Sequence, residues 1–309
     1  MNYVILLKIN VYTFFGINCF KGNKFFLMFN RDEDLHRPTT PLKVYDGDLI
    51  YSLDEISGGT FLCINKATGN FACLLNNAFA ENPYKEGLIL KRGAIPIDFC
   101  KINFVESELN QFFDNLKNRL NEYNGYNFIC GNFNANFIYY FTNNFEGKEV
   151  NKDILPIILK DNKIYGIENK FIEEDSLRVN QGLKLIQEAA ENNKDSTTLI
   201  EEINKCAMEN GTKLLSNEGI VDYHSKSFFK YVQNSVYIED KVVLNGKELL
   251  LEFGTRQNIT IQVDENNNVL VTERFGGIEK NDYSKFIINR QKDVYSKFNF
   301  QLENNKIIK

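Results

Sequence analysis

The chain has 309 residues, a net charge of −5 and an apolar fraction of 43%, a composition that excludes intrinsic disorder for most of its length. The acidic balance argues against a nucleic-acid binder, which needs a basic face, and against attraction to anionic lipid surfaces. The six cysteines include no Cys-x-x-Cys pair, so we expect reduced thiols in a reducing compartment and no zinc site.

The opening of the chain predicts two strands. Residues 3–9 and 24–29 are apolar, and Lys21-Gly22-Asn23 supplies turn residues before the second run. We expect these runs to form an antiparallel pair with a long connection. No apolar stretch reaches the roughly 18 residues that a spanning helix needs, so we expect no transmembrane segment. The first ten residues carry no basic leader, and we expect no export signal.

The next stretches predict a hairpin and a helix. Apolar runs at 60–65 and 70–76 flank Lys66-Ala67-Thr68-Gly69, a turn sequence typical of hairpins. Apolar residues from Leu109 to Leu120 recur at the spacing of one helix face.

The second half of the chain continues this alternation. Residues 155–159 and 163–169 flank Lys160-Asp161-Asn162 and predict a second hairpin. Apolar spacing predicts a helix over 179–190, and Thr198-x-x-Glu201 has the capping-box pattern that begins another. The remaining predicted strands lie at 126–131, 136–142, 236–243, 248–253, 257–263 and 268–274.

This order of elements predicts an α+β fold. Neighbouring strands joined by short turns exclude a doubly wound parallel sheet, which places a helix between successive strands. Antiparallel sheets covered by helices bury the apolar faces of both. No linker or repeat divides the chain, so we expect a single domain over 1–309, with a core of about 1–275 and a frayed tail after about residue 303.

Two polar stretches stand out from this pattern. Asn30-Arg31-Asp32-Glu33, followed by Arg37-Pro38-Thr39, comes directly after the apolar run 24–29. Ser57-Gly58-Gly59-Thr60 precedes a predicted strand, and its paired glycines permit positive φ and close backbone approach. Taken alone, the first stretch is better explained as a solvated turn and the second as an ordinary tight turn.

Together these stretches resemble the NRDE family, also called the Transport and Golgi organisation protein 2 family. The resemblance runs from the first strand to about residue 275 and depends on the order of the motifs. Further matching pieces are Ala72–Asn76, Arg92-Gly93, Gly125-Tyr126-Asn127, Tyr165–Asn169, Phe253–Arg256 and Glu273-Arg274. The resemblance implies an N-terminal-nucleophile-hydrolase-like αββα sandwich, in which two antiparallel sheets lie between helix layers.

Such hydrolases use the amine of the first residue as a base and its Cys, Ser or Thr side chain as the nucleophile. Most members of the family have Cys directly after Met1, whereas this chain has Asn2. An amide is not a nucleophile, and Asn is not among the small second residues that permit removal of Met1. We therefore expect no intact catalytic residue, with Asn2 at the nucleophile place beside Asn30–Asp32. Cys19 is the nearest thiol, but we expect it at the far end of the strand pair.

The candidate pocket residues would surround that place. Distant resemblance to bile-salt and penicillin V acylases puts Arg31 and Asp32 in the pocket and Asn169 where an amide donates to an oxyanion. Asn76 would donate similarly, and Arg256 would bind a carboxylate. The full candidate set is Asn30, Arg31, Asp32, Glu33, Asn76, Asn169 and Arg256. A structural role explains each residue equally well, and Arg31 and Asp32 would then hold the loop 30–48 against the sheet.

Metal and cofactor binding are not predicted. His36 and His224, the two histidines, lack a second ligand at helical or strand spacing, so we expect neither a metal site nor a His-ligated haem. The family resemblance nevertheless keeps a haem or acyl ligand open as a cargo.

Three functions follow from these observations. We favour a non-catalytic binding or trafficking protein on a hydrolase scaffold, holding a small hydrophobic or acyl-type ligand. The resemblance links it to Golgi organisation, secretion, lipid homeostasis or haem movement, in the cytoplasm with Golgi or mitochondrial association. The alternatives are an amidohydrolase with an unidentified nucleophile, and an interaction protein that uses its surface alone.

Overall fold

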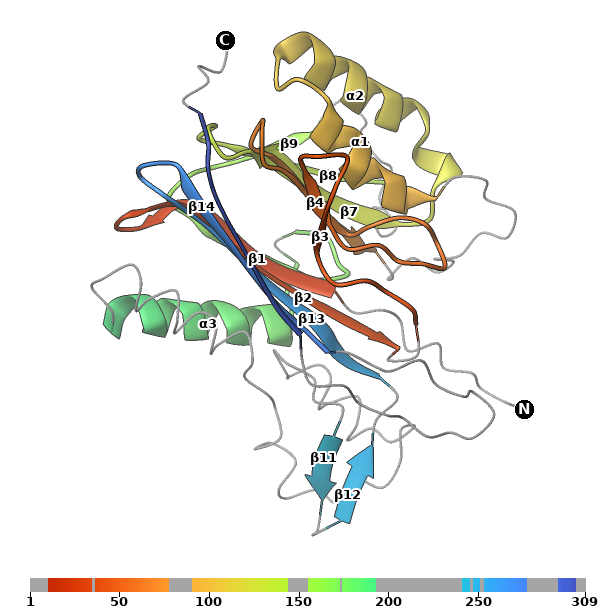
Figure 1. Cartoon of the computed structure of the whole chain (residues 1–309), viewed down its shortest axis with the longest axis vertical. Helices are drawn as coiled ribbons and strands as arrows, with labels where there is room; N and C mark the ends of the chain where they lie inside the picture. Colours follow the sequence, from red (N-terminus) through yellow and green to blue (C-terminus); the bar gives the residue numbers. More distant parts are fainter. Residues whose placement is uncertain are drawn as a thin grey trace.

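The computed structural model of the chain describes residues 11–34, 37–77, 91–143, 155–172, 174–192, 241–244, 247–250, 253–276 and 294–303. This part of the chain has a mixed α+β fold with two large antiparallel sheets, a small two-stranded sheet and three α-helices (Figure 1). The strand pairs within it are antiparallel, as the short turns predict.

The first large sheet has six strands in the order β10-β1-β2-β13-β14-β15. These strands are β1 (Val11–Phe20), β2 (Asn23–Asp34), β10 (Ile164–Ile167), β13 (Phe253–Asp264), β14 (Asn268–Phe275) and β15 (Val294–Gln301). A turn at Asp264–Asn267 joins β13 to β14, the strands predicted at 257–263 and 268–274. Because β15 pairs with β14 and Leu302 is buried, the packed sheet continues beyond residue 275.

The second large sheet has seven strands in chain order from β3 to β9. These are β3 (Lys43–Tyr45), β4 (Leu49–Tyr51), β5 (Leu62–Asn65), β6 (Asn70–Asn76), β7 (Tyr126–Asn132), β8 (Ile138–Thr142) and β9 (Ile157–Leu159). The predicted hairpin is confirmed, because β5 pairs with β6 through a turn that ends at Gly69, whose φ is +78°. A separate hairpin consists of β11 (Lys241–Leu244) and β12 (Lys247–Leu250).

The prediction that residues 3–9 pair with 24–29 is wrong. Both edges of β2 are occupied, one by β1 and the other by β13. Lys21-Gly22 forms the turn between β1 and β2, with Gly22 at a φ of +79°. A two-residue turn fixes the register and avoids the closure entropy of a long loop. Residues 3–9 lie outside the described part of the chain.

The predicted pairing of 155–159 with 163–169 is also wrong. β9 pairs with β8 in the seven-stranded sheet, whereas β10 pairs with β1 in the six-stranded sheet. Asn162 takes a φ of +57°, so a turn does form where its residues predict one. This turn carries the chain from one sheet to the other instead of closing a hairpin.

Helices cover the outer face of each large sheet (Figure 1). The helices are α1 (Ile95–Lys101), α2 (Glu106–Asn118) and α3 (Leu177–Asn192), with short 3-10 turns η1 (Arg92–Ala94) and η2 (Leu120–Glu122). The predicted helices near 109–120 and 179–190 are confirmed as α2 and α3. The sequence analysis missed α1, which has Pro96 in its first turn, where proline is tolerated. The helix predicted to begin at Thr198 lies outside the described residues.

The core has three parts, and strand alternation assigns the side chains of β1 and β2 to two of them. Odd-numbered residues such as Phe15 and Phe29 pack between the two large sheets. Even-numbered residues such as Phe14 and Met28 pack against α3. The third part lies between the seven-stranded sheet and α1 and α2. Because successive side chains of a strand point to opposite faces, this alternation also decides where the polar end of β2 directs its groups.

Candidate functional site

The Asn30–Glu33 tetrad lies near the end of β2 and is buried, with each of its residues at most 3% exposed. The interpretation as a solvated turn is therefore wrong. Arg31 and Glu33 line a cavity between the sheets, whereas Asn30 and Asp32 point to the α3 face. The period of two along the strand thus divides the tetrad into two pairs with different surroundings.

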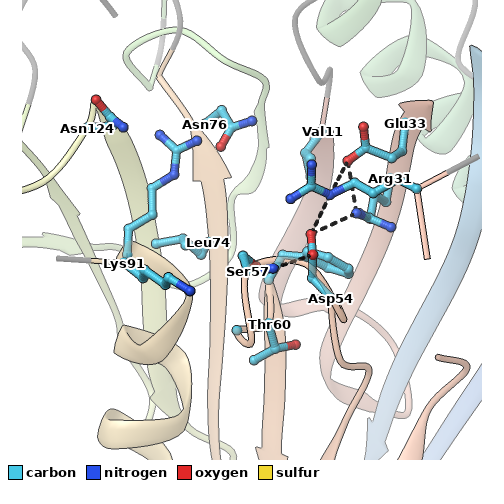
Figure 2. A pocket seen from close by; sticks show the side chains of 15 residues that line it. Val11, Arg31, Glu33, Asp54, Ser57, Thr60, Leu74, Asn76, Lys91 and Asn124 are labelled. Atoms are coloured by element: carbon cyan, nitrogen blue, oxygen red, sulfur yellow. Dashed lines mark hydrogen bonds and ion pairs between the residues drawn. The ribbon is translucent and has the colours of Figure 1, made fainter. Parts of the chain in front are cut away.

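A cavity of about 260 Å³ lies beside the end of β2. In Figure 2, Asn76, Lys91 and Asn124 lie on one side of it, and Arg31, Glu33 and Asp54 lie on the other. Its apolar lining comes from Val11, Phe61 and Leu74. Its charged lining comes from Arg31, Glu33, Arg37, Asp54, Lys91 and Arg92.

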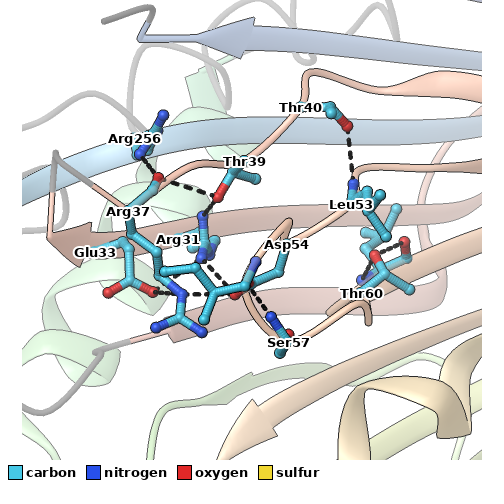
Figure 3. Close-up of polar contacts among 12 residues, drawn as sticks. Arg31, Glu33, Arg37, Thr39, Thr40, Leu53, Asp54, Ser57, Thr60 and Arg256 are labelled. Carbon is cyan, nitrogen blue, oxygen red and sulfur yellow. Dashed lines mark hydrogen bonds and ion pairs between the residues drawn. The ribbon is translucent and has the colours of Figure 1, made fainter. Parts of the chain in front are cut away.

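Two arginines and two carboxylates form a network on one wall (Figure 3). Arg31 Nη2 lies 2.9 Å from Glu33 Oε2 and 3.5 Å from Asp54 Oδ2. Arg37 Nε lies 2.6 Å from Asp54 Oδ2 and 3.7 Å from Glu33 Oε2. Each cation therefore contacts both carboxylates, and the charges of these four groups balance. Arg31 Nη1 also donates to Thr39 Oγ1 at 2.9 Å, which holds the segment after β2 against the sheet.

Burial and charge act in opposite directions within this network. Burial lowers the pKa of Arg31 to about 10, although the neighbouring Glu33 and Asp54 carboxylates favour its charged form. Burial alone would raise the pKa of Asp54, but hydrogen bonds and charge, chiefly from Arg37, hold it below its usual value. The ring of Phe61 lies 4.2 Å from the Arg31 guanidinium carbon, a cation–π contact. Arg31 and Asp54 are therefore both ionised at neutral pH.

Asp54 is the site residue that the sequence analysis missed. Its Oδ1 accepts the backbone N–H groups of Ile56 and Ser57 at 3.1 and 3.0 Å. An Asp that caps the backbone two or three residues ahead is typical of a turn, which was the only signal in the sequence. Because Oδ2 binds Arg37, Asp54 joins the Ser57–Thr60 stretch to the network.

The Ser57–Thr60 stretch and the Arg92-Gly93 pair are in contact through Gly59 and Gly93. The Thr60 N–H donates to Gly93 O at 2.9 Å, and a Cβ on Gly59 would lie only 2.6 Å from the Gly93 Cα. Both positions therefore require glycine because the two backbones are in direct contact. This contact places Lys91 and Arg92 at the cavity opposite the ionic network.

Asp32 connects β2 to other elements on the α3 face. Its Oδ2 accepts from Arg178 Nη1 of α3 at 2.8 Å, and its Oδ1 accepts from Thr255 Oγ1 of β13 at 2.6 Å. The Arg178 guanidinium carbon also lies 4.9 Å from the centroid of the Tyr12 ring. Burial raises the pKa of Asp32, while Arg178 and Thr255 oppose that shift. The structure therefore gives Asp32 a role in docking α3 instead of a place in the cavity lining.

Asn30 and Arg256 also lie away from the cavity lining. Asn30 donates to the Tyr12 hydroxyl and accepts from Asn258 Nδ2. Arg256 donates to the carbonyl of Arg37 (Figure 3). Its guanidinium carbon lies 5.4 Å from the centroid of the Phe275 ring. These contacts match the structural alternative that the sequence left open for both residues.

The two remaining candidate amides lie close to the start of β1. Asn76, at the end of β6, lines the cavity, and its side chain makes no hydrogen bond with another described residue. Asn169 accepts the Val11 N–H on its Oδ1 at 3.4 Å. Asn127 Nδ2 donates to Glu168 O at 3.2 Å and to Lys170 O at 2.7 Å, so it fixes the backbone on both sides of Asn169.

Val11 occupies the place where Asn2 was expected. Val11 pairs with Arg31 in the β1–β2 register and lines the cavity, whereas Asn2 lies outside the described residues. Cys19 lies near the turn at the opposite end of β1, as the strand geometry predicts. Burial raises the pKa of the Cys19 thiol to about 11, so it is protonated at neutral pH.

Neither histidine falls within the described residues. That part of the chain contains no group of three or more His, Cys, Asp or Glu side chains placed to hold a metal ion. None of its helices combines the length and the apolar character that a membrane crossing requires.

The described residues thus define a mixed α+β protein with two facing antiparallel sheets and a small charged cavity at one end of β2. A family model described as Transport and Golgi organisation 2 matches residues 12–275. The chain therefore belongs to the Transport and Golgi organisation 2 family, as its motifs indicate. Comparison with curated proteins finds no match for this chain.

Proposed function

We propose that this protein binds a small organic ligand in the cavity without cleaving it, on an αββα scaffold like that of the N-terminal nucleophile hydrolases. The observation that carries the proposal is the position of Val11. Val11 lines the cavity and is paired with Arg31 in the β1–β2 register. A hydrolase of that type would present its nucleophile at this place. Valine has no nucleophilic atom, and its nitrogen is a peptide N–H that donates to Asn169.

The other lining residues support binding over cleavage. Ser57 and Thr60 supply the hydroxyl groups among the described lining residues, and none of those residues is a histidine that would act as a base. The Thr60 hydroxyl donates to the carbonyl of Leu62 at 2.9 Å, which directs its proton away from a substrate. The described lining residues therefore offer charge and shape to a ligand but no activated nucleophile.

Membership of the family supports a role for this binding in Golgi organisation, with secretion and lipid homeostasis as the processes served. We place the protein in the cytoplasm, with Golgi or mitochondrial association, on the same ground. A haem cargo fits the site less well, because the described cavity lining contains no His, Cys, Met or Tyr that would ligate its iron.

Native mass spectrometry of the protein purified from its own cells tests the proposal. We expect a small molecule that is present in the native spectrum and released on denaturation. Ser57→Phe would place a ring at the cavity and should abolish this adduct. Ala67→Phe adds the same ring on the exposed β5–β6 turn and should retain the adduct. If both variants keep the adduct, or if none is found, the protein acts through its surface and the proposal is wrong.

Intact-mass analysis after treatment with an acylating β-lactam separates binding from hydrolysis. We expect no covalent adduct. An adduct on a cavity residue, or a processed terminus that begins with Cys, Ser or Thr beside the cavity, would instead establish an amidohydrolase.

A further inference from the structure

The two walls of the cavity differ in charge. On one wall, Arg31 and Arg37 are balanced by Glu33 and Asp54. The opposite wall carries Lys91 and Arg92, and the described lining contains no further carboxylate. Among the described residues, four cations and two carboxylates therefore line the cavity, although the net charge of the chain is −5. This excess of positive charge is a local feature, because the composition of the chain would predict the opposite sign.

The wall that carries Lys91 and Arg92, here called the positive wall, also presents hydrogen-bond donors to the cavity. Lys91 is exposed at the cavity and makes no ion pair with another described residue. The Asn76 amide lines the same cavity without a hydrogen bond to another described residue. Arg92 donates to the carbonyl of Gly125, which holds its side chain at this wall. Lys91 therefore offers the cavity an ammonium group and Asn76 offers it an amide N–H, and a carboxylate oxygen accepts from either donor.

Apolar side chains and the small volume limit the rest of the ligand. Val11, Phe61 and Leu74 line the cavity beside the charged groups. Its volume of about 260 Å³ lies just below the range of roughly 300–1,000 Å³ that holds drug-sized ligands. A short aliphatic chain with one anionic end fits both the lining and the volume.

We propose that the ligand of this cavity is a small aliphatic carboxylate, whose anionic group is bound by Lys91 and whose chain packs against Val11, Phe61 and Leu74. This inference depends on the proposed binding function and specifies its ligand class.

Ligand-observed NMR titration with hexanoate, hexanamide and hexylamine tests the inference. The three compounds share a chain length and differ in the charge of the head group. We expect the wild-type protein to bind hexanoate about tenfold more tightly than hexanamide, the effect of one hydrogen bond to a charged group, and to bind hexylamine most weakly. Lys91→Gln should remove most of the preference for hexanoate over hexanamide.

Lys101→Gln is the matched control, since Lys101 is also exposed but does not line the cavity. It should leave the preference unchanged. Equal binding of hexanoate and hexanamide by the wild-type protein would overturn the carboxylate assignment while leaving cavity binding in place. An unchanged preference in a folded Lys91→Gln variant would overturn the assigned anion position. If no compound binds the wild-type protein, the binding function itself fails along with this inference.

Discussion

Asp32 and Arg178 form an ion pair of 2.8 Å in which both side chains are at most 1% exposed. The pair joins the end of β2 to α3, and Thr255 adds a third element to the same carboxylate. Arg31, the preceding residue, faces the cavity on the opposite side of the strand. One short stretch of β2 therefore positions both a helix and a wall of the cavity.

Arg178→Met should destabilise the protein by about 3–5 kcal/mol at neutral pH, because it leaves the Asp32 carboxylate buried without its cation. Urea denaturation measures this free energy of unfolding. Lys184→Met, on the same helix, removes an exposed ion pair with Glu188 and should cost less than about 1 kcal/mol. Similar losses in the two variants would show that the buried pair contributes no more than a surface pair.

Asp54 should make the stability of the protein depend on pH. Its pKa in the folded state lies below the usual value, which is near 4 in the unfolded chain. The stability that its ionised form contributes is complete above about pH 4 and is lost as the pH falls through the folded pKa. Asp54→Asn should therefore be less stable than the wild type at pH 7, and the difference should narrow on acidification.

Urea midpoints for the wild type and Asp54→Asn between pH 3 and pH 7 would measure this effect. Asp48→Asn removes a carboxylate from an exposed pair with Lys66 and should change the stability by less than about 1 kcal/mol. Parallel pH curves for the wild type and Asp54→Asn would contradict the role of Asp54 in the ionic network.

Local signals predicted the strands and helices better than they predicted the partners of those strands. The turn before Gly69 and the apolar face from Leu109 identify β5, β6 and α2 correctly, because a hairpin and a helix face depend on nearby residues. The turn at Asn162 has the same kind of residues, yet the strands on either side belong to different sheets. That outcome depends on which sheet edges are open, and turn residues carry no information about it.

In the candidate site too, local sequence patterns identified some residues but did not predict the contacts between residues far apart in the chain. The sequence identified Arg31 and Asp32 as important, and alternation along a strand places them on opposite faces. The contact between Arg178 and Asp32 joins residues that are 146 positions apart in the chain. No short sequence motif predicts such a contact. Asp54 was missed for the same reason, since its partners Arg31 and Arg37 lie 23 and 17 positions earlier in the chain, at the end of β2 and just after it.

Gly93→Ala should disturb the positive wall of the cavity. A Cβ at this position would lie 2.9 Å from the Gly59 Cα, and neither backbone has a flexible side chain that would yield. We expect a loss of about 1–3 kcal/mol in unfolding free energy and weaker binding of hexanoate. Gly276→Ala is the control, because among the described residues the added Cβ would meet only the Arg256 carbonyl, at 3.5 Å. Comparable effects of the two substitutions would contradict the close backbone contact.

Asn127→Ala should weaken ligand binding although Asn127 does not line the cavity. Its amide holds the backbone around Asn169, and Asn169 in turn accepts the Val11 N–H at the cavity. Loss of these buried hydrogen bonds should cost about 1–3 kcal/mol in unfolding free energy and displace Val11.

Asn132→Ala provides a matched control at the other end of β7. Asn132 is also buried, and its amide donates to Thr68 O and Asn70 Oδ1 at 2.8 and 2.7 Å. Urea denaturation should show a similar loss of stability in both variants, because each loses buried hydrogen bonds of the same kind. NMR titration with hexanoate should show weaker binding only for Asn127→Ala. If both variants bind hexanoate equally well, the link from Asn127 through Asn169 to the cavity does not control ligand binding.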